Sequence, residues 1–203
     1  MTRALMMSAA LAAAQIAAAE PAAFMQGILP AQPSPLVGGG EVLLEVAVEA
    51  TGAVGEIQTL RATAPYTDML RGAVKNWRFE PARTVAGVAV PSRVLVGGFY
   101  GAAIAPGPGL ALGEAPRGVA AASDGVAFPT HTMRALYPAL AFGPAQVFVE
   151  LSIATDGAFT AEAVGDTIAP FREAALQAVR QWRFRPVPAP ALAYVVFGFR
   201  PPP

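Results

Sequence analysis

Apolar and polar residues alternate strictly at two places in the chain. The apolar positions are Val42, Leu44, Val46 and Val48 in the first place, and Val147, Val149, Leu151 and Ile153 in the second. A period of two is typical of a half-buried strand. Thr51-Gly52 and Asp156-Gly157 follow directly, and a tight hairpin requires glycine. Second strands are therefore predicted over 54–62 and 159–164.

A proline opens a helical pattern after each predicted hairpin. Pro65 and Pro170 suit the first helical position, because the missing N–H is harmless there. Apolar residues then recur at helical spacing as far as Trp77 and Trp182. Another proline lies four residues after each tryptophan and ends the helix. Last strands are predicted over 88–100 and 192–200.

The two patterned regions form an internal repeat. A shift of 105 positions aligns 42–81 with 147–186 without a gap, and twelve of the forty pairs are identical. Each copy predicts a β-β-α-β unit in which a right-handed crossover returns the last strand beside the first. The expected fold class is α+β: two tandem small two-layer domains, each with a three-stranded antiparallel-type sheet and one covering helix. The first strand lies in the middle, and the second and last strands form the edges.

The N-terminus has the pattern of a signal peptide. After Arg3, no charge occurs from Ala4 to Ala19, and small residues precede Glu20. This run is short for a membrane span. We expect cleavage near Ala19 and a soluble periplasmic protein with no membrane span; the alternative is an uncleaved anchor in the inner membrane. The expected organisation is a signal peptide over 1–19, an extended lead-in over 20–40, a divergent first domain over 41–100, a Gly/Pro/Ala linker over 101–130 and a second domain over 131–203.

Composition excludes several kinds of chemistry. The 203 residues carry no net charge, which gives no electrostatic reason to expect nucleic acid or an anionic membrane as a partner. Cysteine is absent, and the single histidine, His131, cannot build a metal site alone. No catalytic motif occurs, so we predict no enzyme, no cofactor and no metal. We expect Glu45 and Glu150 to be solvated or paired with arginine.

The pentapeptide Trp-Arg-Phe-x-Pro ends both predicted helices. Trp77 and Trp182 continue the apolar stripe of each helix, so we predict that both are buried in the core. Arg78 and Arg183 allow two interpretations: a solvated arginine whose stem covers the core, or a contact to a partner.

The second copy resembles the C-terminal domain of TonB energy transducers. The shared features are a Tyr-Pro pair before the first strand, a glycine in the hairpin turn and a helix that ends in Trp-Arg-Phe-x-Pro. The matching residues are Arg134, Tyr137-Pro138, Asp156-Gly157, Trp182-Arg183-Phe184 and Pro186. The first copy is similar in part: it has Leu29-Pro30 near the place of Tyr-Pro, and Gly72 lies inside its helix.

The resemblance implies a periplasmic module that binds an extended peptide, the TonB box of an outer-membrane transporter, in energy-dependent transport. In that family the peptide is added as a strand beside the last strand of the sheet, which needs an exposed edge. The partner-binding residues that the resemblance implies are Tyr137, Pro138, Tyr194, Val195, Val196, Phe197, Gly198 and Phe199.

A cell-envelope scaffold is the alternative. Transducers carry an N-terminal membrane helix and a long spacer of Pro with Glu and Lys, and neither is evident in the sequence. Two packed TonB-like domains with a partner other than a transporter, and without energy transduction, would account for this. Leu43 and Phe148 favour the scaffold, because they point to the sheet face away from the helix, where we expect something to cover them.

Overall fold

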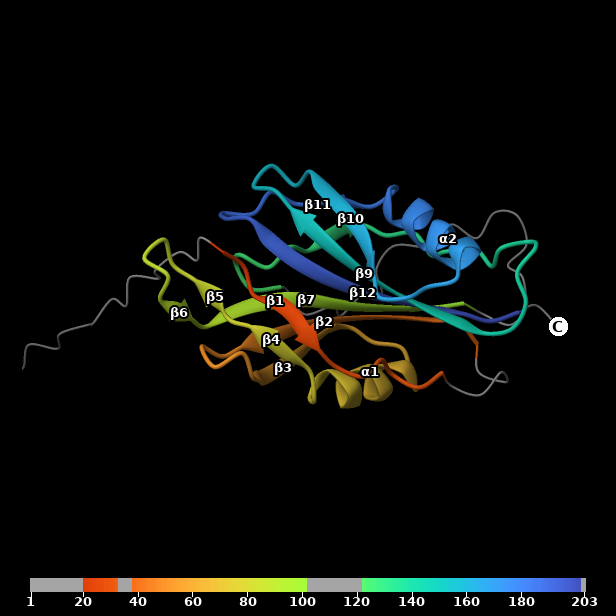
Figure 1. Ribbon diagram of the computed structural model, residues 1–203, viewed down its shortest axis with the longest axis horizontal. Helices are drawn as coiled ribbons and strands as arrows, with labels where there is room; N and C mark the ends of the chain where they lie inside the picture. Colours follow the sequence, from red (N-terminus) through yellow and green to blue (C-terminus); the bar gives the residue numbers. More distant parts are fainter. Residues whose placement is uncertain (1–19, 33–37, 102–121, 202–203) are drawn as a thin grey trace, which may run out of the picture.

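The computed structural model describes residues 20–32, 38–101 and 122–201 (Figure 1). The predicted signal peptide lies outside the described residues, as does most of the predicted linker. Within the described ranges, no helix is long and apolar enough to cross a membrane.

Both predicted β-β-α-β units are present, and the fold class is α+β as predicted. The first unit contains β2 (Gly40–Val48), β3 (Val54–Arg61), α1 (Tyr66–Val74) and β7 (Ser92–Tyr100), with the short hairpin β5 (Ala82–Arg83) and β6 (Ala89–Val90) before β7. The second unit contains β9 (Ala145–Ile153), β10 (Phe159–Val164), α2 (Ala169–Val179) and β12 (Ala191–Phe199). Gly52 and Gly157 have positive φ angles of 80° and 86°, which explains the glycine in each hairpin turn.

The two units share one six-stranded sheet. Its order is β10-β9-β12-β7-β2-β3, so the first strand of each unit lies in the middle of its half, as predicted. The last strands, β7 and β12, pair with each other in parallel, with Ala193 opposite Leu95 and Gly198 opposite Tyr100. The other pairs in this sheet are antiparallel. The prediction that the last strands form free edges is therefore wrong.

Parallel pairing explains why the two helices lie on opposite faces of the sheet (Figure 1). A rotation that exchanges two adjacent parallel strands must have its axis along the strands, and such a rotation turns one face of the sheet into the other. The two copies are related by a rotation of this kind. As a result, α1 covers one face and α2 covers the opposite face.

Each face carries a core to which both units contribute. The cluster under α1 contains Trp77 together with Phe148 of the second unit, with 5.4 Å between the ring centroids. The cluster under α2 contains Trp182 together with Phe99 of the first unit, with 4.8 Å between the centroids. Leu43 is buried in the cluster under α2. The expected cover over Leu43 and Phe148 is thus provided by the opposite unit.

An extended segment precedes the first strand of each unit; we call residues 20–32 arm 1 and residues 122–134 arm 2. Arm 1 contains β1 (Ala23–Gln26), which pairs with β4 (Arg78–Glu80), and arm 2 contains β8 (Pro129–His131), which pairs with β11 (Arg183–Phe184). Residues 20–32 were expected to be an extended lead-in and residues 122–130 part of a linker, but both arms contribute buried residues to the cores, such as Ala22 in arm 1 and Val126 in arm 2. The boundary expected at residue 131 falls inside β8.

The arms cross onto the opposite unit. Gln146 of β9 donates a hydrogen bond through Nε2 to the Pro30 carbonyl of arm 1, at 2.7 Å. At the position equivalent to Gln146, Glu41 of β2 accepts a hydrogen bond from Arg134 Nε of arm 2, at 3.0 Å. Each unit therefore holds the arm of the other unit at the start of its own first strand.

Each tryptophan anchors the arm of its own unit. The indole N–H of Trp77 donates to the carbonyl of Ile28 at 3.0 Å, and that of Trp182 donates to the carbonyl of Met133 at 2.9 Å. The two accepting residues are 105 positions apart, as are the tryptophans. The repeat therefore includes the arms.

Replacing either tryptophan by alanine should lower the free energy of unfolding of the whole chain by about 3 to 5 kcal/mol, because both side chains are fully buried. Urea denaturation followed by circular dichroism measures this. Since each ring packs against both units, we expect one transition that shifts as a whole. Two transitions, of which only one shifts, would contradict the shared core. Trp182→Phe keeps an aromatic ring and should cost less than Trp182→Ala.

Candidate functional site

The predicted partner-binding strand lies at the centre of the sheet, within β12. β12 pairs with β9 on one side and with β7 on the other. The N–H of Gly101 donates to the carbonyl of Gly198 at 2.9 Å, so the backbone of Gly198 points toward β7. Backbone direction alternates along a strand, so Val196 also points toward β7 and Phe197 points toward β9. The expected open edge over Tyr194 to Phe199 is wrong, because both sides of this strand are paired.

The sequence contained a signal of this central position. Residues 193–199 and 94–100 are buried without alternation. An uninterrupted apolar run is typical of a strand that is covered on both faces, whereas a half-exposed strand alternates. α1 and α2 provide cover on opposite faces, which accounts for both runs.

Tyr194 holds arm 1 in place. Its hydroxyl accepts a hydrogen bond from the N–H of Phe24 at 2.7 Å and donates to the carbonyl of Ala22 at 3.3 Å. Burial, and next the negative charge of Glu150, raise the pKa of the Tyr194 phenol far above its usual value. The Tyr194 side chain is therefore neutral and buried, and it is not available to bind a peptide at the surface.

Tyr137 and Pro138 lie in the loop between arm 2 and β9. The Tyr137 hydroxyl donates to the carbonyl of Gly143 at 2.8 Å, and its ring meets Phe171 of α2 edge-on, with 5.5 Å between centroids. Pro138 is partly exposed and accepts a hydrogen bond from Ala141 N–H at 3.1 Å. These contacts fix the loop against α2. Phe199 of β12 also contacts Phe171, with 5.1 Å between the ring centroids, so Tyr137 and the end of β12 meet in the core under α2 and not at a peptide-binding edge.

The outer strands of the sheet are β3 and β10. The pairing of β3 with β2 shifts register twice, once between Leu43 and Leu44 and once between Val46 and Val48. Such irregularities protect an edge from unwanted pairing. β10 pairs with β9 in unbroken register from Phe159 to Val164. Of these two edges, β10 is the regular one.

The hairpin turn determines which backbone groups of β10 face outward. The N–H of Ala154 donates to the carbonyl of Ala158 at 2.8 Å, so these two residues point toward each other. Because backbone direction alternates in an antiparallel pair, the N–H and C=O groups of Phe159, Ala161 and Ala163 point away from β9. These three alternate residues therefore offer backbone hydrogen bonds to an added strand.

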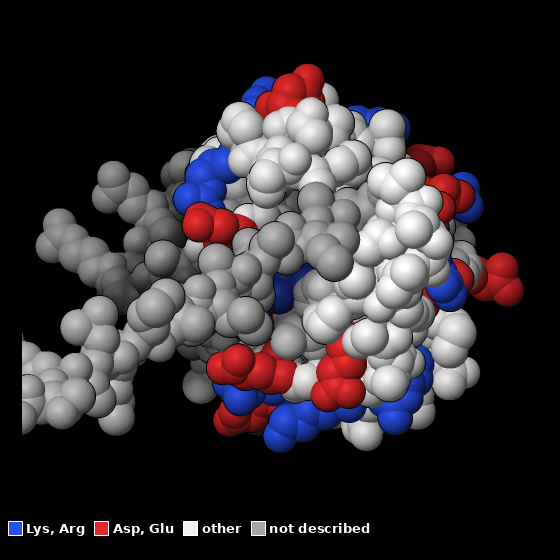
Figure 2. All heavy atoms as spheres, turned by 90° about the vertical axis from the view of Figure 1, so that its left-hand side faces the viewer, with Lys and Arg blue, Asp and Glu red and all other residues white. Residues whose placement is uncertain are grey.

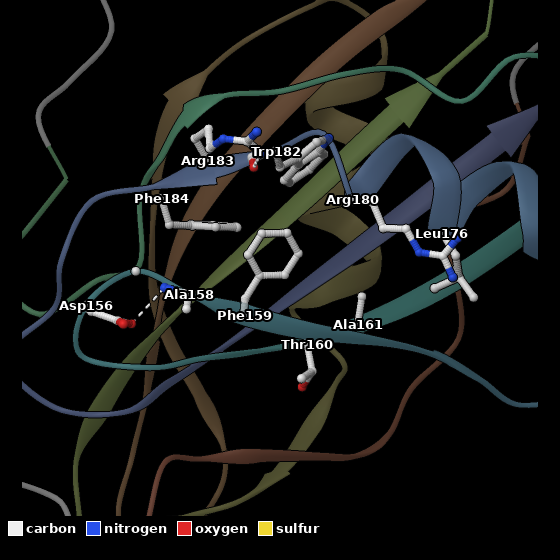
Figure 3. Close-up of a pocket in the computed structure, with 11 residues that line it drawn as sticks. Asp156, Ala158, Phe159, Thr160, Ala161, Leu176, Arg180, Trp182, Arg183 and Phe184 are labelled. Carbon is white, nitrogen blue, oxygen red and sulfur yellow. Dashed lines mark hydrogen bonds between the residues drawn. The ribbon is translucent and has the colours of Figure 1, made fainter.

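A groove of about 640 Å³ lies beside the first half of β10 (Figure 3). It is formed by the β9–β10 turn, β10, the end of α2, and β11. The rings of Phe159 and Phe184 form an apolar surface, edge to face, with 5.3 Å between centroids. In Figure 3 the side chains of Arg183 and Trp182 lie above the ring of Phe159, and Arg180 lies to its right beside Leu176. The groove is therefore apolar around these rings, and Arg180, Arg183 and Asp156 are the charged residues that line it.

In the first unit, a strand bridge occupies the equivalent position beside β3. An isolated bridge joins Ala53 to Arg78, which connects the start of β3 to β4. Ala158 and Arg183 are the equivalent residues in the second unit, and within the described ranges they form no such bridge. The two copies have thus diverged at their outer strands, and β10 keeps the open side.

The side of the molecule that carries the β5–β6 hairpin (Figure 1) has acidic and basic residues in mixed positions (Figure 2). Figure 2 shows acidic and basic residues interspersed around the rim of this face. A face of this kind gives no electrostatic preference for a polyanion. Among the residues that the structure describes, no group of three or more His, Cys, Asp or Glu side chains could hold a metal ion.

Glu45 is paired with arginine, as predicted. Its buried carboxylate accepts hydrogen bonds from Arg93 Nη1 at 2.6 Å and from the N–H of Ser123 at 2.8 Å. Burial alone would raise the pKa of this carboxyl, but the hydrogen bonds from Ser123 and Arg93 and the charge of Arg93 outweigh it, so the pKa is lowered. Glu45 therefore binds arm 2 to the first unit. His131 is exposed on β8, in agreement with the surface position expected for it.

No family model matches the chain, and no curated protein matches it either.

Glu45→Gln should destabilise the protein by about 1 to 3 kcal/mol at pH 7, because it removes a charged partner of Arg93. The folded-state pKa of Glu45 lies below its unfolded value, so this stabilisation is present above the unfolded pKa and is lost as the pH falls toward the folded pKa. Urea melts of both proteins between pH 7 and pH 3 should show a shrinking difference. A difference that stays constant over this range would mean that the charge of Glu45 contributes nothing.

Proposed function

We propose that this protein is a periplasmic peptide-binding module that captures an extended segment of another protein by strand addition along β10. One observation carries the proposal: the regular outer edge of β10 lies directly beside an open groove. In strand addition, main-chain hydrogen bonds provide affinity and pockets for alternate side chains provide specificity. β10 offers both.

The outward backbone of Phe159, Ala161 and Ala163 would supply the hydrogen bonds. The side chains of these residues are half-buried on the α2 side, while those of Thr160, Glu162 and Val164 are exposed on the other face. An added strand would therefore place every second side chain over the groove.

The resemblance to TonB C-terminal domains supports an outer-membrane transporter as the source of the peptide. The edge that this family uses belongs to its last strand, and here that strand is paired on both sides. We propose that β10 takes over the role of receiving edge, and that the protein is exported and acts by binding alone, without catalysis.

A cell-envelope scaffold is the second candidate. The β7–β12 pairing favours it, because this pairing joins two units into one rigid sheet through strands that the resemblance assigns to partner binding. In that case β10 would receive a segment of an envelope protein other than a transporter.

Ala161→Pro tests the proposed edge. The N–H of Ala161 points away from β9, so proline removes a donor to the added strand and leaves the β9 ladder intact. We expect the variant to unfold like the parent and to bind peptides from transporter N-termini at least about tenfold more weakly, as measured by calorimetry.

Two variants serve as controls. Ala161→Ser keeps both the N–H group and a small side chain and should keep binding, whereas Thr160→Pro removes a donor to β9 and should lower stability. A folded Ala161→Pro protein that binds such a peptide as tightly as the parent would rule out β10. A parent that binds no transporter peptide would favour the scaffold.

A further inference from the structure

We infer that the segment captured at β10 has opposite charges on its two faces, with acidic side chains toward the groove and a basic side chain beside Glu162. This inference rests on the proposed function and specifies the chemistry of the partner. It follows from the charges that the structure places on the two faces of β10.

The groove is lined by two arginines and by one carboxylate, that of Asp156, which accepts a hydrogen bond from the N–H of Ala158 at 2.9 Å, so positive charge predominates on this face. Both Arg180 and Arg183 are exposed, and in the part of the chain that the structure describes neither belongs to an ion pair. Arg183 Nη1 donates to the carbonyl of Trp182 at 2.7 Å, which holds its guanidinium near the groove. Arginine forms strong hydrogen bonds with carboxylates, so acidic side chains on the added strand are favoured on this face.

The centre of the groove face favours an apolar side chain. Ala161 has a small side chain, which leaves room for a larger one directly opposite it. Phe159 and Leu176 line the groove on either side of that position. An aliphatic residue opposite Ala161 would therefore cover their apolar surface.

Among the described residues of β10, those on the opposite face are Thr160, Glu162 and Val164, and none of them carries a positive charge. Glu162 lies directly across from Glu150 of β9 in the strand register. Like charges in such a cross-strand pair are destabilising. No ion pair among the described residues includes either carboxylate. A lysine or arginine on the added strand opposite Glu162 would relieve this repulsion.

These preferences define a short sequence pattern for an antiparallel strand. Read from its N-terminus, the strand places residues opposite Ala163, Glu162, Ala161, Thr160 and Phe159 in turn. The pattern is acidic, basic, apolar, any residue and acidic. The last position faces the groove, and the first lies on the same face of the added strand, beyond Ala161, which is the last residue of β10 that lines the groove. The second position faces Glu162.

The test uses two synthetic peptides of the same composition with identical flanking residues. The matched peptide has the core Glu-Lys-Leu-Thr-Glu, and the rearranged peptide has the core Lys-Glu-Leu-Glu-Thr, which places both acids on the face of Glu162, one opposite Glu162 and one opposite Thr160. Calorimetry with the full chain should show that the matched peptide binds about tenfold more tightly at low salt, and that the advantage falls as salt rises.

Variants of the protein assign the effect to residues. Arg180→Ala and Arg183→Ala should each weaken the matched peptide about threefold or more. Lys75→Ala and Arg78→Ala are the matched controls in the first unit, because they occupy the equivalent positions 105 residues earlier, and they should change nothing. Arg78 makes the same contact to its neighbouring carbonyl as Arg183, which makes this control sensitive to a purely structural role. Glu162→Lys should reverse the preference at the second peptide position.

The outcomes separate the inference from the proposed function. Equal binding of both peptides, abolished by Ala161→Pro, would overturn the charge pattern and leave strand addition at β10 intact. Binding that Ala161→Pro does not affect would overturn both, as would the failure of both peptides to bind. A preference for the matched peptide that the Lys75 and Arg78 variants reduce as much as the Arg180 and Arg183 variants would also overturn the inference.

Discussion

The parallel pairing of β7 with β12 is the constraint on which the rest of the structure depends. It joins two similar units through their last strands and, because the strands run in the same direction, it turns the two helices to opposite faces. Each half of the sheet then has one face under its own helix and one face that the opposite unit must cover. The same pairing consumes both last strands, so only β3 and β10 remain as outer edges.

The two tryptophans connect the layers that this pairing creates. Each tryptophan follows the C-terminal end of the helix of its own unit. Its ring contacts an aromatic side chain of the other unit, and its indole N–H donates a hydrogen bond to the arm of its own unit. Neither unit could therefore lose its arm or its neighbour without exposing apolar surface and an unpaired indole N–H. The repeated Trp-Arg-Phe-x-Pro motif is structural in its tryptophan and phenylalanine, while the arginines remain at the surface.

Local patterns predicted the elements and the place of each last strand beside the first strand of its unit, but they did not predict that the two last strands pair with each other. Alternation, turn glycines and helical spacing specify strands and helices within a few residues, and these were placed well in both copies. Pairing between distant strands leaves a weaker trace: in β12 it is the loss of alternation over 193–199, which reflects cover on both faces. The arms escaped detection because their backbone is held by carbonyl groups, such as those of Ile28 and Met133, which any residue supplies. The two units differ at their outer strands: Ala53 and Arg78 form a bridge in the first unit, whereas in the described ranges Ala158 and Arg183 form none in the second. The same residue types occupy both pairs of positions, so the sequence does not reveal this difference.

The contact between Phe24 and Tyr194 spans 170 residues and joins the beginning of the described chain to its last strand. Contacts between such distant residues form late in folding, because the entropy of closing a long loop must be overcome first. β1 is synthesised early, yet it cannot reach its final place before β12 exists. If the protein is exported as we propose, this order of assembly helps to keep the nascent polypeptide unfolded, and hence able to thread through a translocation channel, until synthesis is nearly complete.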